Sequence, residues 1–84
     1  MRTQLGSRGY AYLRGSDYVH AITDFDAAIK LFAAQGSGGA ESYFDRGIAY
    51  WRLGDRDRAE QDFRQALTLD AGIEAKMAKI GLMR

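Results

Sequence analysis

Apolar and small residues recur at every third or fourth position along most of the chain, the spacing of one face of an α-helix. In the second half of the chain this pattern stops at Gly54 and Asp55 and then resumes. The residues at helical spacing before the break are Tyr43, Gly47, Tyr50 and Trp51. Those after the break are Ala59, Phe63, Ala66, Leu67 and Leu69. Glycine commonly follows the end of a helix, and aspartate commonly starts the next one. The pattern predicts two helices joined by a short turn, with Asp57 and Glu60 resembling a capping box at the second start.

The first half of the chain has the same plan. Gly15-Ser16-Asp17 forms the predicted turn. The helix after it carries Ala21, Phe25, Ala28, Ile29 and Leu31. Residues 33–39 are rich in glycine, alanine and serine and predict a flexible loop. The segment 73–84 predicts one more helix, whose apolar face is formed by Ile73, Met77, Ile80, Leu82 and Met83. No segment alternates apolar and polar residues as a strand does, so the fold is predicted to be all-α.

The two halves also repeat each other in sequence. With an offset of 38 residues, eleven identities fall in one register between residues 8–31 and 46–69. The identical positions of the first copy are Arg8, Gly9, Ala11, Tyr12, Arg14, Asp17, Ala21, Asp24, Phe25, Ala28 and Leu31. A repeat of this kind indicates two copies of one helical hairpin.

The repeated unit resembles the tetratricopeptide repeat, a helix–turn–helix unit with a large-x2-Leu-Gly-x2-Tyr stretch followed by Ala-x3-Phe. The second copy reads Tyr43-x2-Arg46-Gly47-x2-Tyr50 and then Ala59-x3-Phe63, and the first copy matches it. The resemblance implies antiparallel helical hairpins stacked as a short right-handed solenoid of five helices. It divides one domain, 1–84, into repeat one at 2–35, a Gly-rich insertion at 36–39, repeat two at 40–72 and a capping helix at 73–84.

The sequence departs from the family pattern at three places. Arginine stands where the pattern has leucine, at Arg8 and Arg46. Alanine replaces the closing proline at Ala33 and Ala71, and four inserted residues lengthen the period. The insertion leaves the angle between the hairpins open.

Gly9 and Gly47 lie inside predicted helices, where glycine costs about 1 kcal/mol relative to alanine. We expect Gly9 and Gly47 to allow close approach of the partner helix, helped by the small side chains of Ala21 and Ala59. The rings predicted to fill the space between hairpins are Tyr12, Tyr50, Phe25 and Phe63.

Each copy also places an arginine sixteen residues before an aspartate, and a hairpin can bring two such positions together. We predict the ion pairs Arg8–Asp24 and Arg46–Asp62, since the planar fork of arginine suits a partly buried carboxylate. The alternative is exposed surface charge that contributes little. In either case the role is structural.

The composition excludes several kinds of protein. The 84 residues contain no cysteine and one histidine, so disulfides, thiolate metal sites and histidine clusters are excluded. Twelve basic and eleven acidic side chains leave a net charge of +1, which argues against nucleic-acid and membrane-surface binding. The polar first nine residues argue against a signal peptide, and no apolar run is long enough for a membrane helix. We expect a cytoplasmic location by default.

No arrangement of residues predicts catalysis. His20 has no nucleophile or metal-ligand spacing around it, and we expect an exposed histidine on a helix surface. The Gly-rich segment lacks the Gly-Lys-Ser/Thr ending of a phosphate-binding loop. We therefore predict a protein that is not an enzyme and that needs no cofactor and no metal.

The resemblance implies a binding surface. In this family the first helices of successive hairpins line a concave groove that receives a peptide or helix of a partner protein. The implied groove residues are Gly6, Tyr10, Leu13, Arg14, Phe44, Ile48, Trp51 and Arg52, with Ala78 and Leu82 extending the surface. Arg14 and Arg52 would lie at the rim, where they suit acidic flanks of the ligand. Tyrosine, tryptophan and arginine are enriched at binding hot spots. The alternative is that these aromatic residues complete the core of a small bundle.

Two functions remain open at this point. The first is a protein-interaction module that binds an apolar or aromatic segment of a partner; the sequence contains no asparagine, which argues against the carboxylate clamp of some family members. The second is a self-assembling homo-oligomer, because about three repeats are usually needed for a stable array. Contacts between copies would use Leu5, Met77, Ile80 and Met83, or an exchange of hairpins through the Gly-rich insertion. That the chain is part of a longer array also stays open.

Overall fold

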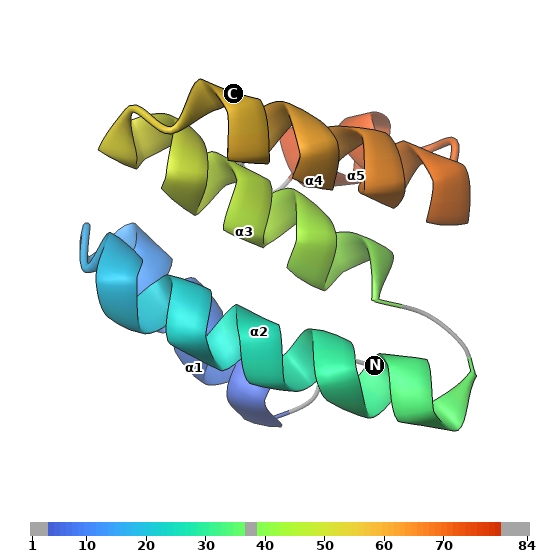
Figure 1. Cartoon of the computed structure of the whole chain (residues 1–84), viewed down its shortest axis with the longest axis horizontal. Helices are drawn as coiled ribbons and strands as arrows, with labels where there is room; N and C mark the ends of the chain where they lie inside the picture. Colours follow the sequence, from blue (N-terminus) through green and yellow to red (C-terminus); the bar gives the residue numbers. More distant parts are fainter. Residues whose placement is uncertain (1–3, 37–38, 80–84) are drawn as a thin grey trace.

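The computed structural model describes the backbone of residues 4–36 and 39–79, and side chains from residue 8 to residue 77 within these ranges. The described chain forms helices α1 (Gln4–Arg14), α2 (Tyr18–Gln35), α3 (Ala40–Leu53), α4 (Arg56–Leu69) and α5 (Ile73–Lys79). The hairpin of α1 and α2 packs against the hairpin of α3 and α4, and α5 lies behind α4 in Figure 1. The predicted all-α fold of stacked hairpins is confirmed.

The turns within the two hairpins have the same structure. Asp17 and Asp55 cap α2 and α4 by accepting hydrogen bonds from the backbone N–H groups of His20 and Arg58, at 3.3 and 3.2 Å. The prediction that Asp57 caps α4 is wrong, because Asp55 already occupies the position before the first helical residue. Each turn contains a left-handed residue after the end of the preceding helix: Ser16, with φ 64°, follows α1, and Gly54, with φ 88°, follows α3.

The loop between the hairpins is shorter than predicted. Residues 33–35 continue α2 instead of belonging to the loop, because alanine and glutamine are good helix formers. The helix ends at Gln35 and is followed by Gly36, whose φ of 75° is left-handed; Gly39, with φ 91°, precedes α3. The expected fifth helix is described from Ile73 to Lys79.

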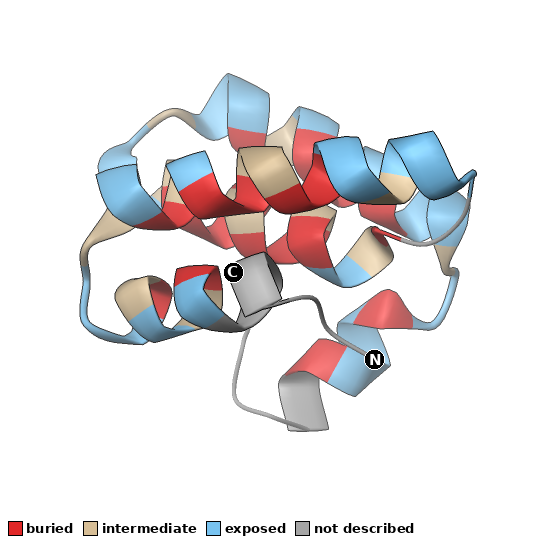
Figure 2. Ribbon diagram, turned by 90° about the horizontal axis from the view of Figure 1, so that it is seen from below, coloured by how far each residue is buried: buried red, intermediate tan, exposed pale blue. Residues whose placement is uncertain are grey.

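The core lies where the helices face one another, as the buried positions in Figure 2 show. Helix α3 is central, because it contacts each of the other four helices. The buried cluster consists of Leu13, Ala21, Phe25, Phe44, Ile48, Ala49, Ala59, Phe63, Ala66, Ile73 and Met77. Burial of Ile73 and Met77 shows that α5 closes the core on one side of the second hairpin.

Gly9 and Gly47 each form a seat for the phenylalanine of their own hairpin. A Cβ atom on Gly9 would lie 2.8 Å from Cε1 of Phe25, and one on Gly47 would lie 2.8 Å from Cε1 of Phe63. Ala21 and Ala59 are fully buried beside these contacts. The close approach predicted for the glycines is therefore made mainly by a ring, and Phe25 and Phe63 lie within the hairpins as well as between them.

Replacing Gly47 with alanine should destabilise the fold even though alanine favours helix. The added Cβ meets a ring that the packed core holds in place, so we expect a net loss of about 1–2 kcal/mol in the free energy of unfolding. Chemical denaturation measures this loss. Gly15→Ala is the matched control, because a Cβ there lies 3.6 Å from its nearest neighbours. Equal free energies of unfolding for the two variants would contradict the close contact between Gly47 and the ring of Phe63.

Candidate functional site

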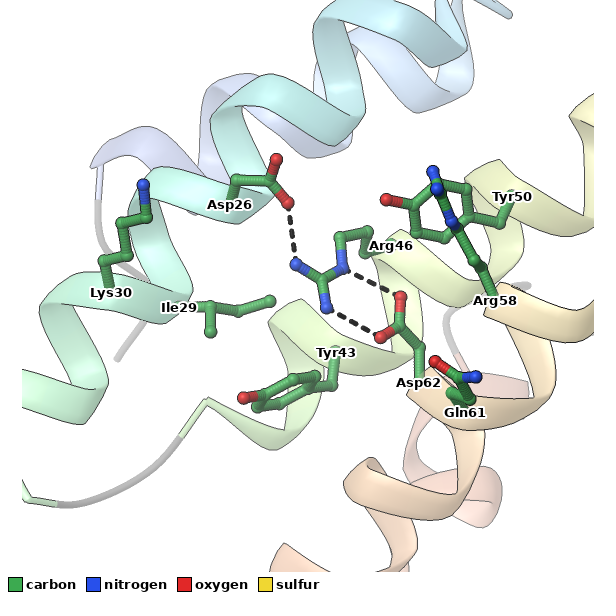
Figure 3. A pocket seen from close by; sticks show the side chains of 9 residues that line it. All are labelled: Asp26, Ile29, Lys30, Tyr43, Arg46, Tyr50, Arg58, Gln61 and Asp62. Carbon is green, nitrogen blue, oxygen red and sulfur yellow. Dashed lines mark hydrogen bonds and ion pairs between the residues drawn. The ribbon is translucent and has the colours of Figure 1, made fainter. Parts of the chain in front are cut away.

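The side chain of Arg46 joins three helices. Its Nε and Nη2 atoms donate hydrogen bonds of 2.8 and 2.7 Å to the two carboxylate oxygens of Asp62 on α4. Its Nη1 atom donates a hydrogen bond of 2.7 Å to Asp26 on α2 (Figure 3). One guanidinium group on α3 therefore links the two helices of its own hairpin and also links that hairpin to the first.

An open cleft of about 470 Å³ surrounds this arginine. It is lined by Asp26, Ile29, Lys30, Tyr43, Arg46, Tyr50, Arg58, Gln61 and Asp62. Figure 3 shows Asp26 and Ile29 reaching from α2 toward Arg46. The lining thus comes from α2, α3 and α4 and follows the junction between the hairpins.

Aromatic rings lie on either side of Arg46. Its Cζ atom lies 5.4 Å from the ring centre of Tyr43 and 5.9 Å from that of Tyr50. The hydrogen bonds that Arg46 donates to Asp62 and Asp26 raise the pKa of its guanidinium above the ordinary value, against the opposing effect of burial. The cation is paired with two carboxylates from neighbouring helices, so the arginine forms a structural junction between the hairpins.

The first hairpin contains the equivalent pair. Arg8 donates hydrogen bonds of 2.7 Å from Nε and 2.8 Å from Nη2 to the carboxylate of Asp24. The Arg8 fork lowers the pKa of the Asp24 carboxyl below its ordinary value, mainly through these hydrogen bonds. The structure thus brings together both arginine–aspartate pairs that the sixteen-residue spacing predicts.

The implied groove residues do not form one exposed surface. Leu13, Phe44 and Ile48 are buried in the core, with 2–6% of each residue exposed, which corrects their assignment to an open groove. For Phe44 and Ile48 the physical reason is the central position of α3, which contacts each of the other four helices. The ring of Phe44 packs 5.1 Å from that of Phe63.

The other four implied groove residues keep solvent exposure. Tyr10 and Trp51 are partly buried, and Arg14 and Arg52 are exposed. The guanidinium of Arg56 lies 4.0 Å from the ring centre of Trp51, and that of Arg14 lies 5.7 Å from the ring centre of Tyr10. The rings of Tyr10 and Trp51 are thus each in contact with an arginine guanidinium, a cation–π arrangement.

Of the four residues proposed for contacts between copies, the structure describes the side chain of Met77. Met77 is 1% exposed, which corrects its assignment to an exposed end of the chain: it belongs to the core beneath α5. The predictions for Gly6, Ala78, Leu82, Leu5, Ile80 and Met83 fall on residues or side chains outside those that the structure describes.

His20 is exposed on α2, as the sequence predicts. Its Nδ1 atom lies 2.7 Å from the carboxylate of Asp17, and this contact lowers the pKa of the Asp17 carboxyl. The imidazole ring stacks on Tyr12 with ring centres 5.1 Å apart.

Comparison with known proteins identifies the repeat. The model of the tetratricopeptide repeat matches residues 1–71. The chain belongs to the tetratricopeptide repeat family. A search of curated proteins found no significant match, nor did a search of solved structures.

In this tetratricopeptide repeat protein, the residues of the described ranges were compared with the requirements of a membrane-spanning helix and of a metal site. None of their helices combines the length and apolar character needed to cross a bilayer. No group of three or more histidine, cysteine, aspartate or glutamate side chains in these ranges is placed to hold a metal ion.

Sequence reasoning missed Asp26, the residue that links the two repeats. The repeat comparison conceals it, because the position 38 residues later is Arg64 and so the link is not duplicated. The available signal was the arginine itself: arginine has two carboxylate-binding edges, and Asp62 uses only one of them.

Loss of the link between the repeats should weaken the tetratricopeptide stack. Asp26→Asn removes the charge that receives Arg46 Nη1, and because the side chain is 44% exposed we expect a loss of roughly 1 kcal/mol in unfolding free energy. Urea denaturation measures it. The control is Lys30→Gln, an exposed residue on the same helix without an ion pair in the described structure. If both variants unfold alike, the link contributes nothing.

The Arg8–Asp24 pair should make stability depend on pH in the acid range. Because the folded pKa of Asp24 is lowered, the folded state binds this proton less readily than the unfolded state. The stabilisation is complete above the unfolded pKa near 4 and is lost as pH falls through the folded value. The stability difference between wild type and Asp24→Asn should therefore be largest at neutral pH and should shrink below about pH 4. Urea denaturation from pH 7 to pH 2 tests this, and a constant difference would contradict it.

Proposed function

We propose that this protein is a non-enzymatic protein-interaction module that binds a peptide or helix of a partner on the exposed side of α1 and α3. The tetratricopeptide repeat is generally a module of protein–protein interaction, and the family match covers residues 1–71. The proposed contact residues are Tyr10, Arg14, Trp51 and Arg52. Their common feature, an aromatic or arginine side chain with solvent access above a packed core, is the observation that carries the proposal.

The chemistry of this surface favours an apolar or aromatic segment with acidic flanks. Trp51 and Tyr10 offer large rigid rings, a residue type enriched where binding energy is concentrated. Arg52 is exposed and has no ion pair among the described residues, so its charge is available to a ligand carboxylate. Leu13, Phe44 and Ile48 are buried in the core and are not part of the proposed surface.

Selection from a displayed peptide library tests the proposal. Binders of the wild type should lose at least about tenfold in affinity to Arg52→Glu and Trp51→Ala, measured by fluorescence anisotropy. Melting temperatures show whether each variant remains folded, and Arg52→Glu is expected to melt as the wild type does because no described ion pair is broken.

The matched control is Lys30→Glu, which reverses the charge of an exposed lysine on α2. Its affinity for the selected peptides should remain that of the wild type. The proposal fails if the folded Arg52→Glu and Trp51→Ala variants bind as tightly as Lys30→Glu does.

A further inference from the structure

The junction between the hairpins shows how this chain receives a helix. On the second hairpin, Arg46 and Tyr50 form a surface that α2 covers with Asp26 and Ile29. Burial by α2 leaves only 20% of the Arg46 side chain exposed. Helix α2 therefore contacts the second hairpin through two side chains: the carboxylate of Asp26, which accepts a hydrogen bond from Arg46 Nη1, and the aliphatic side chain of Ile29 one helical turn later.

The first hairpin carries the same surface 38 residues earlier. We call it the open face; it consists of Arg8, Tyr12, His20, Thr23 and Asp24, the equivalents of Arg46, Tyr50, Arg58, Gln61 and Asp62. The geometry is repeated as well as the sequence. Arg8 forks onto Asp24 through Nε and Nη2, the two atoms that Arg46 uses on Asp62. The ring of His20 lies on Tyr12, and the guanidinium of Arg58 lies 5.8 Å from the ring centre of Tyr50.

The open face has no helix on it in the described structure. The side chain of Arg8 is 60% exposed, three times the value for Arg46. Its Nη1 atom, the equivalent of the one that binds Asp26, makes no hydrogen bond within the described residues. The first hairpin therefore presents a preformed half of the junction, and the missing half is a helix with the chemistry of α2.

A second copy of the chain is a poor occupant. End-to-end stacking would place α4 of one copy on the open face of the next. At the α4 positions equivalent to Asp26 and Ile29 stand Arg64 and Leu67. The aliphatic contact would be retained, but Arg64 would face Arg8, and like charges brought together oppose association.

We propose that the open face docks an amphipathic helix of a partner protein, which presents an aspartate or glutamate to Arg8 and a branched aliphatic residue one turn later. This surface is distinct from the one proposed above, since Arg8 and Tyr12 lie on a different side of α1 from Tyr10 and Arg14. Arg64 on α4 makes the choice selective, because it disfavours a further copy of the chain.

The probe is a helical peptide with the sequence 18–35 of this chain, stapled on the side that is exposed in the structure. Its Phe25 is replaced with glutamine so that the peptide does not exchange with α2 in the core. A fluorescent label reports binding to the full chain by anisotropy, and amide chemical shifts locate the contact. We expect saturable binding with shifts clustered at the open face. A peptide with Asp26→Arg, which imitates α4, should bind at least about tenfold more weakly.

Two protein variants complete the test. Arg8→Lys keeps a cation for Asp24 but loses the fork that serves two carboxylates, so it should weaken binding severalfold. Arg14→Ala alters the other side of α1 and should leave binding unchanged, which separates this proposal from the previous one. Absence of binding, shifts clustered away from the open face, or equal binding of the Asp26→Arg peptide would overturn the proposal. So would light scattering that shows end-to-end association of the chain alone at the concentrations used.

Discussion

The hydrogen bonds of Arg46 are the constraint on which the arrangement of the two repeats depends. A partly buried guanidinium requires acceptors, and Asp62 supplies them on one edge while Asp26 supplies one on the other. Leucine, which the family pattern has at this position, would pack α3 on its neighbours without fixing their direction. Arginine adds a directional contact, so the angle between the hairpins is set by charge geometry as well as by shape.

Much of the fold follows from local sequence pattern. The helical period, the repeat and the turn residues predict the hairpins, and the sixteen-residue spacing predicts which arginine meets which aspartate. The misses have physical reasons. Burial of Phe44 and Ile48 depends on how many helices surround α3, which periodicity within α3 does not report. The contact of Asp26 with Arg46 depends on the angle between hairpins, which the inserted residues leave undetermined in the sequence.

The two repeats are equal in fold but unequal in charge. Asp26 and Arg64 occupy equivalent positions on α2 and α4, with opposite signs. This single difference makes the two hairpins present opposite charges at one equivalent position: α2 meets Arg46 of α3 with Asp26, whereas α4 presents the exposed Arg64 there. Repeat proteins are approximately sums of units and nearest-neighbour interfaces, so a change of sign at one interface position alters which neighbour each end accepts.

The seating of Phe25 on Gly9 and of Phe63 on Gly47 also bears on how the chain folds. Each ring lies sixteen residues after its glycine, so each hairpin closes over a short loop with a small entropic cost. Contacts of such low sequence separation favour fast folding. The contact between Asp26 and Arg46, in contrast, joins residues of different hairpins.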